Sequence, residues 1–150
     1  MTTPQISFEF FPPKTKEGEI KLNSVCAELA ALNPAFISVT YGAGGVKQKG
    51  TLQTVQSIQH IGQTVAPHLS CVGASSAHLS SLLTTYRQQG IRQLVALRGD
   101  LPSGMGQYGA LQHADQLVSF IREQTGDWFH IHVAAYPEFH PQARSSHEDI

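Results

Sequence analysis

Five short apolar, β-prone runs recur along this chain, and stretches with helical spacing of apolar residues separate them. The runs are residues 6–11, 35–41, 66–72, 93–98 and 129–136. Each is short and apolar, as expected for a buried strand. The sequence therefore predicts five strands that alternate with four helices.

The intervening stretches carry helical periodicity and helix-boundary residues. Asn33-Pro34 is expected to stop the first helix, Ser75 or Ser76 to cap the third, and Gly90 and Gly126 to follow helix ends. The second helix, near residues 51–61, has the weakest pattern. Apolar positions of the first and fourth helices are Leu22, Val25, Cys26, Leu29, Ala110, Ala114, Leu117, Val118 and Ile121.

Alternating strands and helices favour a parallel sheet, because parallel neighbours need a crossover connection. Two architectures fit this pattern. A flavodoxin-like doubly wound sheet uses five strands, whereas a (β/α)8 barrel typically needs roughly 250 residues. The length of 150 residues favours the first, but residues 137–150 carry no helical pattern after the last strand, which indicates an interrupted βα unit.

Composition excludes several classes of protein. Ten Lys and Arg residues against eleven Asp and Glu residues give a formal charge of −1, which argues against nucleic-acid binding and polybasic membrane binding. No apolar run approaches the ~20 residues of a membrane-spanning helix, and the N-terminus has no signal-peptide pattern. Cys26 and Cys71 lack disulfide or zinc spacing. We expect one cytoplasmic domain spanning residues 1–150.

Polar residues collect where the predicted strands end. They are Glu9, Thr40-Tyr41, His68, Arg98-Gly99-Asp100 and Tyr136-Pro137-Glu138. The carboxyl ends of parallel strands share one edge of the sheet, so residues far apart in sequence meet there. This rim is the candidate site.

Glu9 has phenylalanines on both sides, at positions 8, 10 and 11. An apolar setting favours the neutral carboxylic acid, which suits a general acid near neutral pH. The alternative is a carboxylate paired with a basic residue, for which Arg98 is the obvious candidate. Arg98-Gly99-Asp100 offers a forked donor, a flexible joint and an acceptor, which suits an anionic ligand that forms hydrogen bonds.

Other motifs are incomplete. Residues 42–47 begin like a dinucleotide fingerprint but have Lys47 in place of the third glycine, and residues 45–51 lack the lysine of a phosphate-binding loop. We expect a mobile βα loop there. His130 and His132 share a strand face without a third ligand, so we expect no metal site.

Five motifs in order resemble the flavin-dependent methylenetetrahydrofolate reductases. They are residues 7–13 (SFEFFPP), 38–43 (SVTYGA), 67–71 (PHLSC), 95–102 (VALRGDLP) and 134–141 (AAYPEFHP). The resemblance runs from Ile6 to the end of the chain, and the catalytic domain of the family is nearly twice this long. It implies the first five strands of a truncated (β/α)8 barrel, in the sheet order 1-2-3-4-5.

The resemblance also implies a reaction. In this family NAD(P)H reduces bound FAD, which then passes a hydride to 5,10-methylenetetrahydrofolate and gives 5-methyltetrahydrofolate, in one-carbon metabolism and methionine biosynthesis. Glu9 is similar to the general acid that opens the folate ring, and Asp100 to the aspartate beside flavin and folate. Positions similar to the FAD contacts are Thr40, Tyr41, His68, Arg98, Gly99, Asp100, Tyr136, His140, Ala143 and Asp149.

Two other functions compete with this one. A non-catalytic fragment would pair its open sheet edge with another chain, and a flavodoxin-like domain would bind FMN or act in signalling. The sequence does not distinguish NADH from NADPH as the electron donor, and it is compatible with a homo-oligomer.

Overall fold

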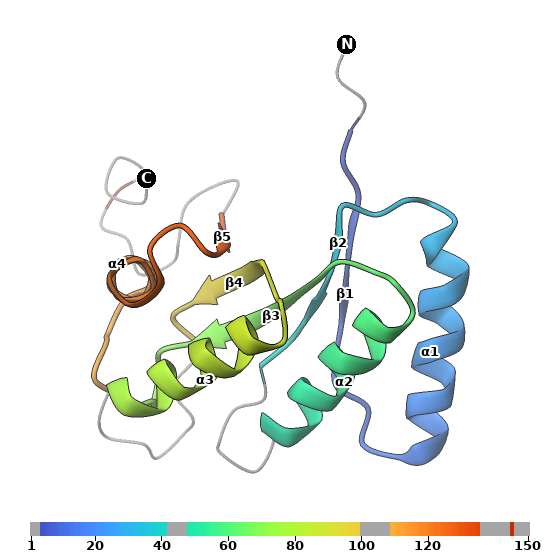
Figure 1. Ribbon diagram of the computed structural model, residues 1–150, viewed down its shortest axis with the longest axis horizontal. Coiled ribbons are helices and arrows are strands. Elements are labelled where there is room, and N and C mark those ends of the chain that lie inside the picture. Colours follow the sequence, from blue (N-terminus) through green and yellow to red (C-terminus); the bar gives the residue numbers. More distant parts are fainter. Residues whose placement is uncertain (1–3, 42–47, 100–108, 136–144, 146–150) are drawn as a thin grey trace.

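The computed structural model describes residues 4–41, 48–99, 109–135 and 145. Strands and helices alternate along the chain, as the sequence predicts (Figure 1). The elements are β1 (Ser7–Phe10), α1 (Lys16–Ala30), β2 (Phe36–Val39), α2 (Gln48–His60), β3 (Val65–Ser70), α3 (Ser76–Gln88), β4 (Gln93–Leu97), α4 (Ala114–Thr125) and β5 (His130–Val133).

The five strands form one parallel sheet in the order β1-β2-β3-β4-β5. A flavodoxin-like sheet would have the order 2-1-3-4-5, so that alternative is wrong although the chain length favours it. Sequential order is the order of strands around a barrel wall. The prediction of the first five strands of a (β/α)8 barrel is confirmed.

Local signals set most of the helix boundaries. Ser75 caps α3 by accepting a hydrogen bond from the backbone N–H of His78 at 3.2 Å. Gly90, with φ +73°, and Gly126, with φ +57°, follow the ends of α3 and α4, as predicted. The start of α4 differs from the prediction. The side chain of Gln116 accepts hydrogen bonds from the two backbone N–H groups just before the helix, which leaves Ala110 outside it.

The helices cover the outer face of the sheet. Figure 1 shows α4, α3, α2 and α1 following one another around the outside of the strands. Ile37 and Val39 of β2 point toward this layer and are fully buried. Helix residues of the same core are Val55, Ile58, Leu79, Leu83, Leu117 and Ile121. No helix within the described ranges is long and apolar enough to cross a lipid bilayer.

The sheet is strongly curved. Phe36 of β2 and His132 of β5 are separated by two intervening strands, yet their ring centroids lie 4.3 Å apart. A flat sheet would hold these strands about 14 Å apart, at 4.7–4.9 Å per neighbouring pair. The contact therefore crosses the concave side of the sheet, which is the inner side of a barrel wall.

Candidate active site

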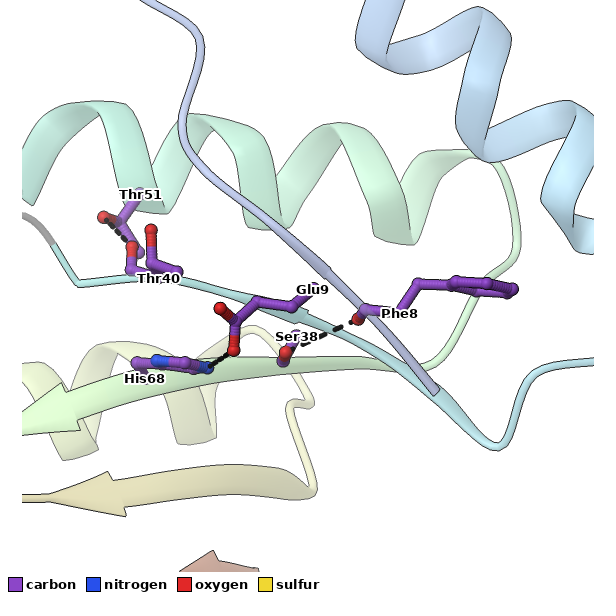
Figure 2. Close-up of polar contacts among 6 residues, drawn as sticks. All are labelled: Phe8, Glu9, Ser38, Thr40, Thr51 and His68. Carbon is purple, nitrogen blue, oxygen red and sulfur yellow. Dashed lines mark hydrogen bonds and ion pairs between the residues drawn. The ribbon is translucent and has the colours of Figure 1, made fainter. Parts of the chain in front are cut away.

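The candidate site lies on the concave face, toward the carboxyl ends of β1, β2 and β3. Glu9 of β1 pairs in register with Ser38 of β2, and His68 lies on β3 (Figure 2). Side chains alternate between the faces of a strand, so residues two apart share this face. Three of the strand-end residues predicted to form a rim, Glu9, Thr40 and His68, thus come from three adjacent strands.

Glu9 and His68 are in direct side-chain contact in this site. Nε2 of His68 lies 3.3 Å from Oε2 of Glu9. The His68 side chain is only 7% exposed, whereas that of Glu9 is 54% exposed. Among the described residues, Nε2 of His68 has no partner with hydrogen-bond geometry. A buried ring nitrogen therefore meets a carboxylate that is open to the concave side.

Burial sets the protonation behaviour of His68. Removing the imidazole from water lowers its pKa below the ordinary value, and the nearby negative charge of Glu9 opposes this shift without reversing it. The neutral imidazole is thus favoured near neutral pH. A neutral ring can donate a hydrogen bond to a carboxylate from Nε2, or accept one there from a carboxylic acid.

The apolar surroundings predicted for Glu9 are not found. Phe8 and Phe10 are its sequence neighbours, but alternation along the strand places them on the opposite face, where Phe10 packs against the core. The acidic group itself is more than half exposed. The basic side chain that contacts it among the described residues is His68, and not Arg98 as the alternative interpretation expected.

Two hydroxyl groups support this part of the sheet. Ser38 donates a hydrogen bond to the carbonyl oxygen of Phe8 at 3.4 Å, which links β2 to β1 beside Glu9 (Figure 2). Thr51, in the first turns of α2, donates to the carbonyl oxygen of Thr40 at 3.1 Å. Sequence reasoning missed both roles. The sequence signal that could have indicated the second role is a threonine, Thr51, near the start of the helix that follows β2.

The backbone after β4 has a conformation that requires glycine. Gly99 has φ +83°, and a Cβ atom there would lie 2.0 Å from Oγ of Ser70. That hydroxyl donates a hydrogen bond to the carbonyl oxygen of Arg98 at 2.9 Å. Ser70 therefore fixes the path of the chain at the residues expected to contact a cofactor, a role that sequence reasoning also missed.

Tyr41 continues the rim toward α3. Its hydroxyl lies 3.4 Å from Nε2 of His78, in the first turn of that helix. This contact joins the end of β2 to the element that follows β3. The tyrosine ring is thereby oriented at the same end of the sheet as Glu9.

The remaining predicted site residues lie outside the described residues. They are Asp100, Tyr136, His140, Ala143 and Asp149, together with the expected loop at residues 42–47.

His130 and His132 share one face, as predicted, with ring centroids 4.8 Å apart. Nε2 of His132 lies 2.6 Å from the side-chain oxygen of Gln93. Among the described residues, no three His, Cys, Asp or Glu side chains are grouped as a metal site would require.

Comparison with known proteins identifies the family of this chain. The methylenetetrahydrofolate reductase family model matches residues 1–150. The 5,10-methylenetetrahydrofolate reductases of Pectobacterium carotovorum and of Escherichia coli are 44% and 42% identical to the chain over 146 residues, which is 97% of the chain and 48% of each relative. A rice protein described as a probable methylenetetrahydrofolate reductase (NADH) is 39% identical over 95% of the chain and 25% of its own length.

The chain thus spans about half the length of the bacterial relatives that it matches. The match covers the strands that carry Glu9 and His68. The chain belongs to the methylenetetrahydrofolate reductase family.

Proposed function

We propose that residues 1–150 form the N-terminal part of a catalytic barrel domain that reduces 5,10-methylenetetrahydrofolate to 5-methyltetrahydrofolate, with FAD as cofactor and NAD(P)H as electron donor. The observation that supports this most directly is the contact between Glu9 and His68 on the concave face. It provides an accessible carboxyl group at the end of the sheet where barrel enzymes carry out chemistry. Family membership supports this substrate class.

The described residues fit a flavin nucleotide at this rim. Nε2 of His68 is buried and lacks a hydrogen-bond partner among them, so a ligand on the concave face could supply one. We assign Thr40, Tyr41, His68, Arg98 and Gly99 to FAD binding, with Asp100, Tyr136, His140, Ala143 and Asp149 assigned on the resemblance alone. When bound, FAD would accept a hydride from NAD(P)H and supply it to the folate.

The work of this chain on the folate is proton transfer and charge stabilisation. We assign Glu9 as the general acid that donates a proton to a ring nitrogen as the methylene bridge opens. Its carboxyl group is exposed to the concave side, so a bound folate could reach it. We assign Asp100 a negative charge that stabilises the cationic iminium formed on the substrate. Both roles are proposals that rest on the family motif.

The Glu9→Gln variant of the flavin-loaded enzyme that contains this chain tests the assignment. The amide keeps the size and a hydrogen-bond donor but cannot release a proton. Flavin reduction by NAD(P)H should stay close to the original rate, whereas reoxidation by 5,10-methylenetetrahydrofolate should slow by about 10²- to 10⁴-fold, the usual contribution of general acid catalysis.

Stopped-flow absorbance measures the two half-reactions separately. Glu17→Gln, in the first turn of α1, is the matched control and should change neither rate. Equal slowing of both half-reactions by Glu9→Gln would indicate a structural role. Unchanged reoxidation would refute the general-acid assignment.

Running the reductive half-reaction with NADH and with NADPH determines the electron donor. The name of the rice relative supports NADH.

A further inference from the structure

Two arginines surround the one tryptophan of the chain at the amino-terminal ends of β4 and β5. Arg87 is in the last turn of α3, Arg92 directly precedes β4, and Trp128 lies between α4 and β5. The guanidinium carbons lie 4.8 Å and 3.3 Å from the centroid of the indole ring. This group is at the end of the sheet opposite to the carboxyl ends that hold the candidate active site.

The indole ring has a fixed position. Its Nε1–H donates a hydrogen bond to the carbonyl oxygen of Ile91 at 2.9 Å. The ring face attracts cations, which explains why the guanidinium groups stack on it. The ring carries no net charge, however, so the positive charges of Arg87 and Arg92 are not neutralised by it. Neither arginine forms an ion pair with a carboxylate in the part of the chain that the structure describes.

A cavity of about 440 Å³ lies beside this cluster and is lined by residues of α3 and of the end of α4. Arg87, Gln124 and Trp128 are among the residues that line it. The side-chain oxygen of Gln124 lies 3.4 Å from the hydroxyl of Ser80, which donates to it. The amide N–H groups of Gln124 are then the donors left for a ligand.

The threonine hydroxyl groups of the cavity wall already donate to backbone carbonyl oxygens, so they are not available as donors to a ligand. Thr84 donates to the carbonyl oxygen of Ser80 at 2.9 Å, and Thr125 donates to that of Ile121 at 2.7 Å. Within the described residues the donors that the wall offers to a ligand are therefore guanidinium and amide N–H groups. The hydroxyl oxygens can act only as acceptors. A ligand that presents several acceptor oxygens and negative charge matches this set.

We propose that this cavity binds a phosphate-class oxyanion, held by Arg87 and Gln124, with the charge of Arg92 adding to the attraction. Guanidinium groups bind such anions through paired N–H donors. Because the cavity is at the amino ends of the strands, binding there is separate from folate and flavin chemistry. The proposal does not depend on the proposed function.

The tryptophan is a direct reporter of this site, because the chain has only one. Inorganic phosphate is titrated at constant ionic strength with chloride as the balancing anion, and Trp128 emission is followed. We expect a saturable change, with binding weakened about tenfold or more in Arg87→Ala, which removes a charge-assisted bond. Arg87→Lys should be intermediate, because it keeps the charge and loses the fork. Lys21→Ala, on α1, is the control and should bind like the original chain.

The indole N–H signal in NMR shows whether the variants keep the fold, since it reports the bond to Ile91. Arg92→Ala should retain this signal and also bind more weakly. A second titration uses adenosine monophosphate. Tighter binding than inorganic phosphate identifies the oxyanion as part of a larger ligand, and equal binding identifies the free ion. No saturable change, or equal affinity in Arg87→Ala with the indole signal intact, would overturn the proposal.

Discussion

Replacing Gly99 by alanine tests how the backbone at the rim is held. Gly99 has φ +83°, and the added methyl group would lie 2.0 Å from Oγ of Ser70. The serine hydroxyl therefore has to rotate away, which breaks its 2.9 Å hydrogen bond to the carbonyl oxygen of Arg98. Two costs add up in this variant: the left-handed backbone of a residue with a Cβ atom, and the lost hydrogen bond.

The expected loss of folding free energy is about 2–3 kcal/mol, from about 1–2 kcal/mol for the left-handed conformation and about 1 kcal/mol for the hydrogen bond. Gly62 separates the two contributions. It has φ +81°, and a methyl group added there would meet nothing within 4 Å, so Gly62→Ala should cost only the backbone part. Gly99→Ala should therefore destabilise the chain by about 1 kcal/mol more than Gly62→Ala.

Urea unfolding followed by circular dichroism measures both variants. The same Gly99→Ala change is also made in a Ser70→Ala chain, where the hydroxyl is already absent. The excess loss relative to Gly62→Ala should then shrink, because only the Cβ atom of residue 70, 3.2 Å from the new methyl group, still has to shift. An equal loss for Gly99→Ala and Gly62→Ala, or an excess unchanged by Ser70→Ala, would refute the reasoning.

Three further outcomes follow from the described contacts. Burial lowers the pKa of His68 below 6.5, so the unfolded chain takes up this proton first as the pH falls. The contribution of His68 to folding stability should be complete above pH 6.5 and decline below it. Glu9→Gln should move the NMR titration of His68 to still lower pH, because the negative charge of Glu9 raises its pKa. A move to higher pH would contradict the assigned electrostatic role of Glu9. Thr51→Val removes the donor to the Thr40 carbonyl and should destabilise the chain by about 1 kcal/mol in urea unfolding. Thr51→Ser keeps the hydroxyl and should leave the stability unchanged. Equal losses in the two variants would show that the hydroxyl is unimportant. Burial raises the pKa of the Cys71 thiol, so a thiol-specific reagent at neutral pH should modify it much more slowly in the folded chain than in urea, and equal rates would contradict its burial.

The alternation of strands and helices could be predicted from the sequence, but the sheet order could not be derived from periodicity. Apolar runs identify strands because burial requires them. The same runs fit a doubly wound sheet and a barrel wall, and the chain length favoured the wrong one. The ring contact between Phe36 and His132 distinguishes the two, and it depends on curvature accumulated over four strands. Only the family motifs carried that information in advance.

The candidate site was predictable in part. Glu9 and His68 were found because polar residues at successive strand ends must converge, and the structure brings them within 3.3 Å. The prediction of an apolar environment for Glu9 was wrong, because consecutive residues of a strand point to opposite faces of the sheet. Ser70 and Thr51 were missed because each acts on a backbone carbonyl, 28 and 11 residues away in sequence, and carbonyl partners leave no pattern of residue types.

The polar groups of the concave face differ in whether the protein itself satisfies them. A parallel sheet with both faces buried is ordinarily apolar on both, yet the inner side of this one carries polar groups along its length. Some of these groups satisfy one another, as Nε2 of His132 lies 2.6 Å from the Gln93 side-chain oxygen. Near the carboxyl ends Nε2 of His68 is buried without a hydrogen-bond partner among the described residues, beside an exposed carboxylate. Unsatisfied buried polar atoms are costly, so a ligand that supplies the missing partner of His68 would gain binding energy from that contact.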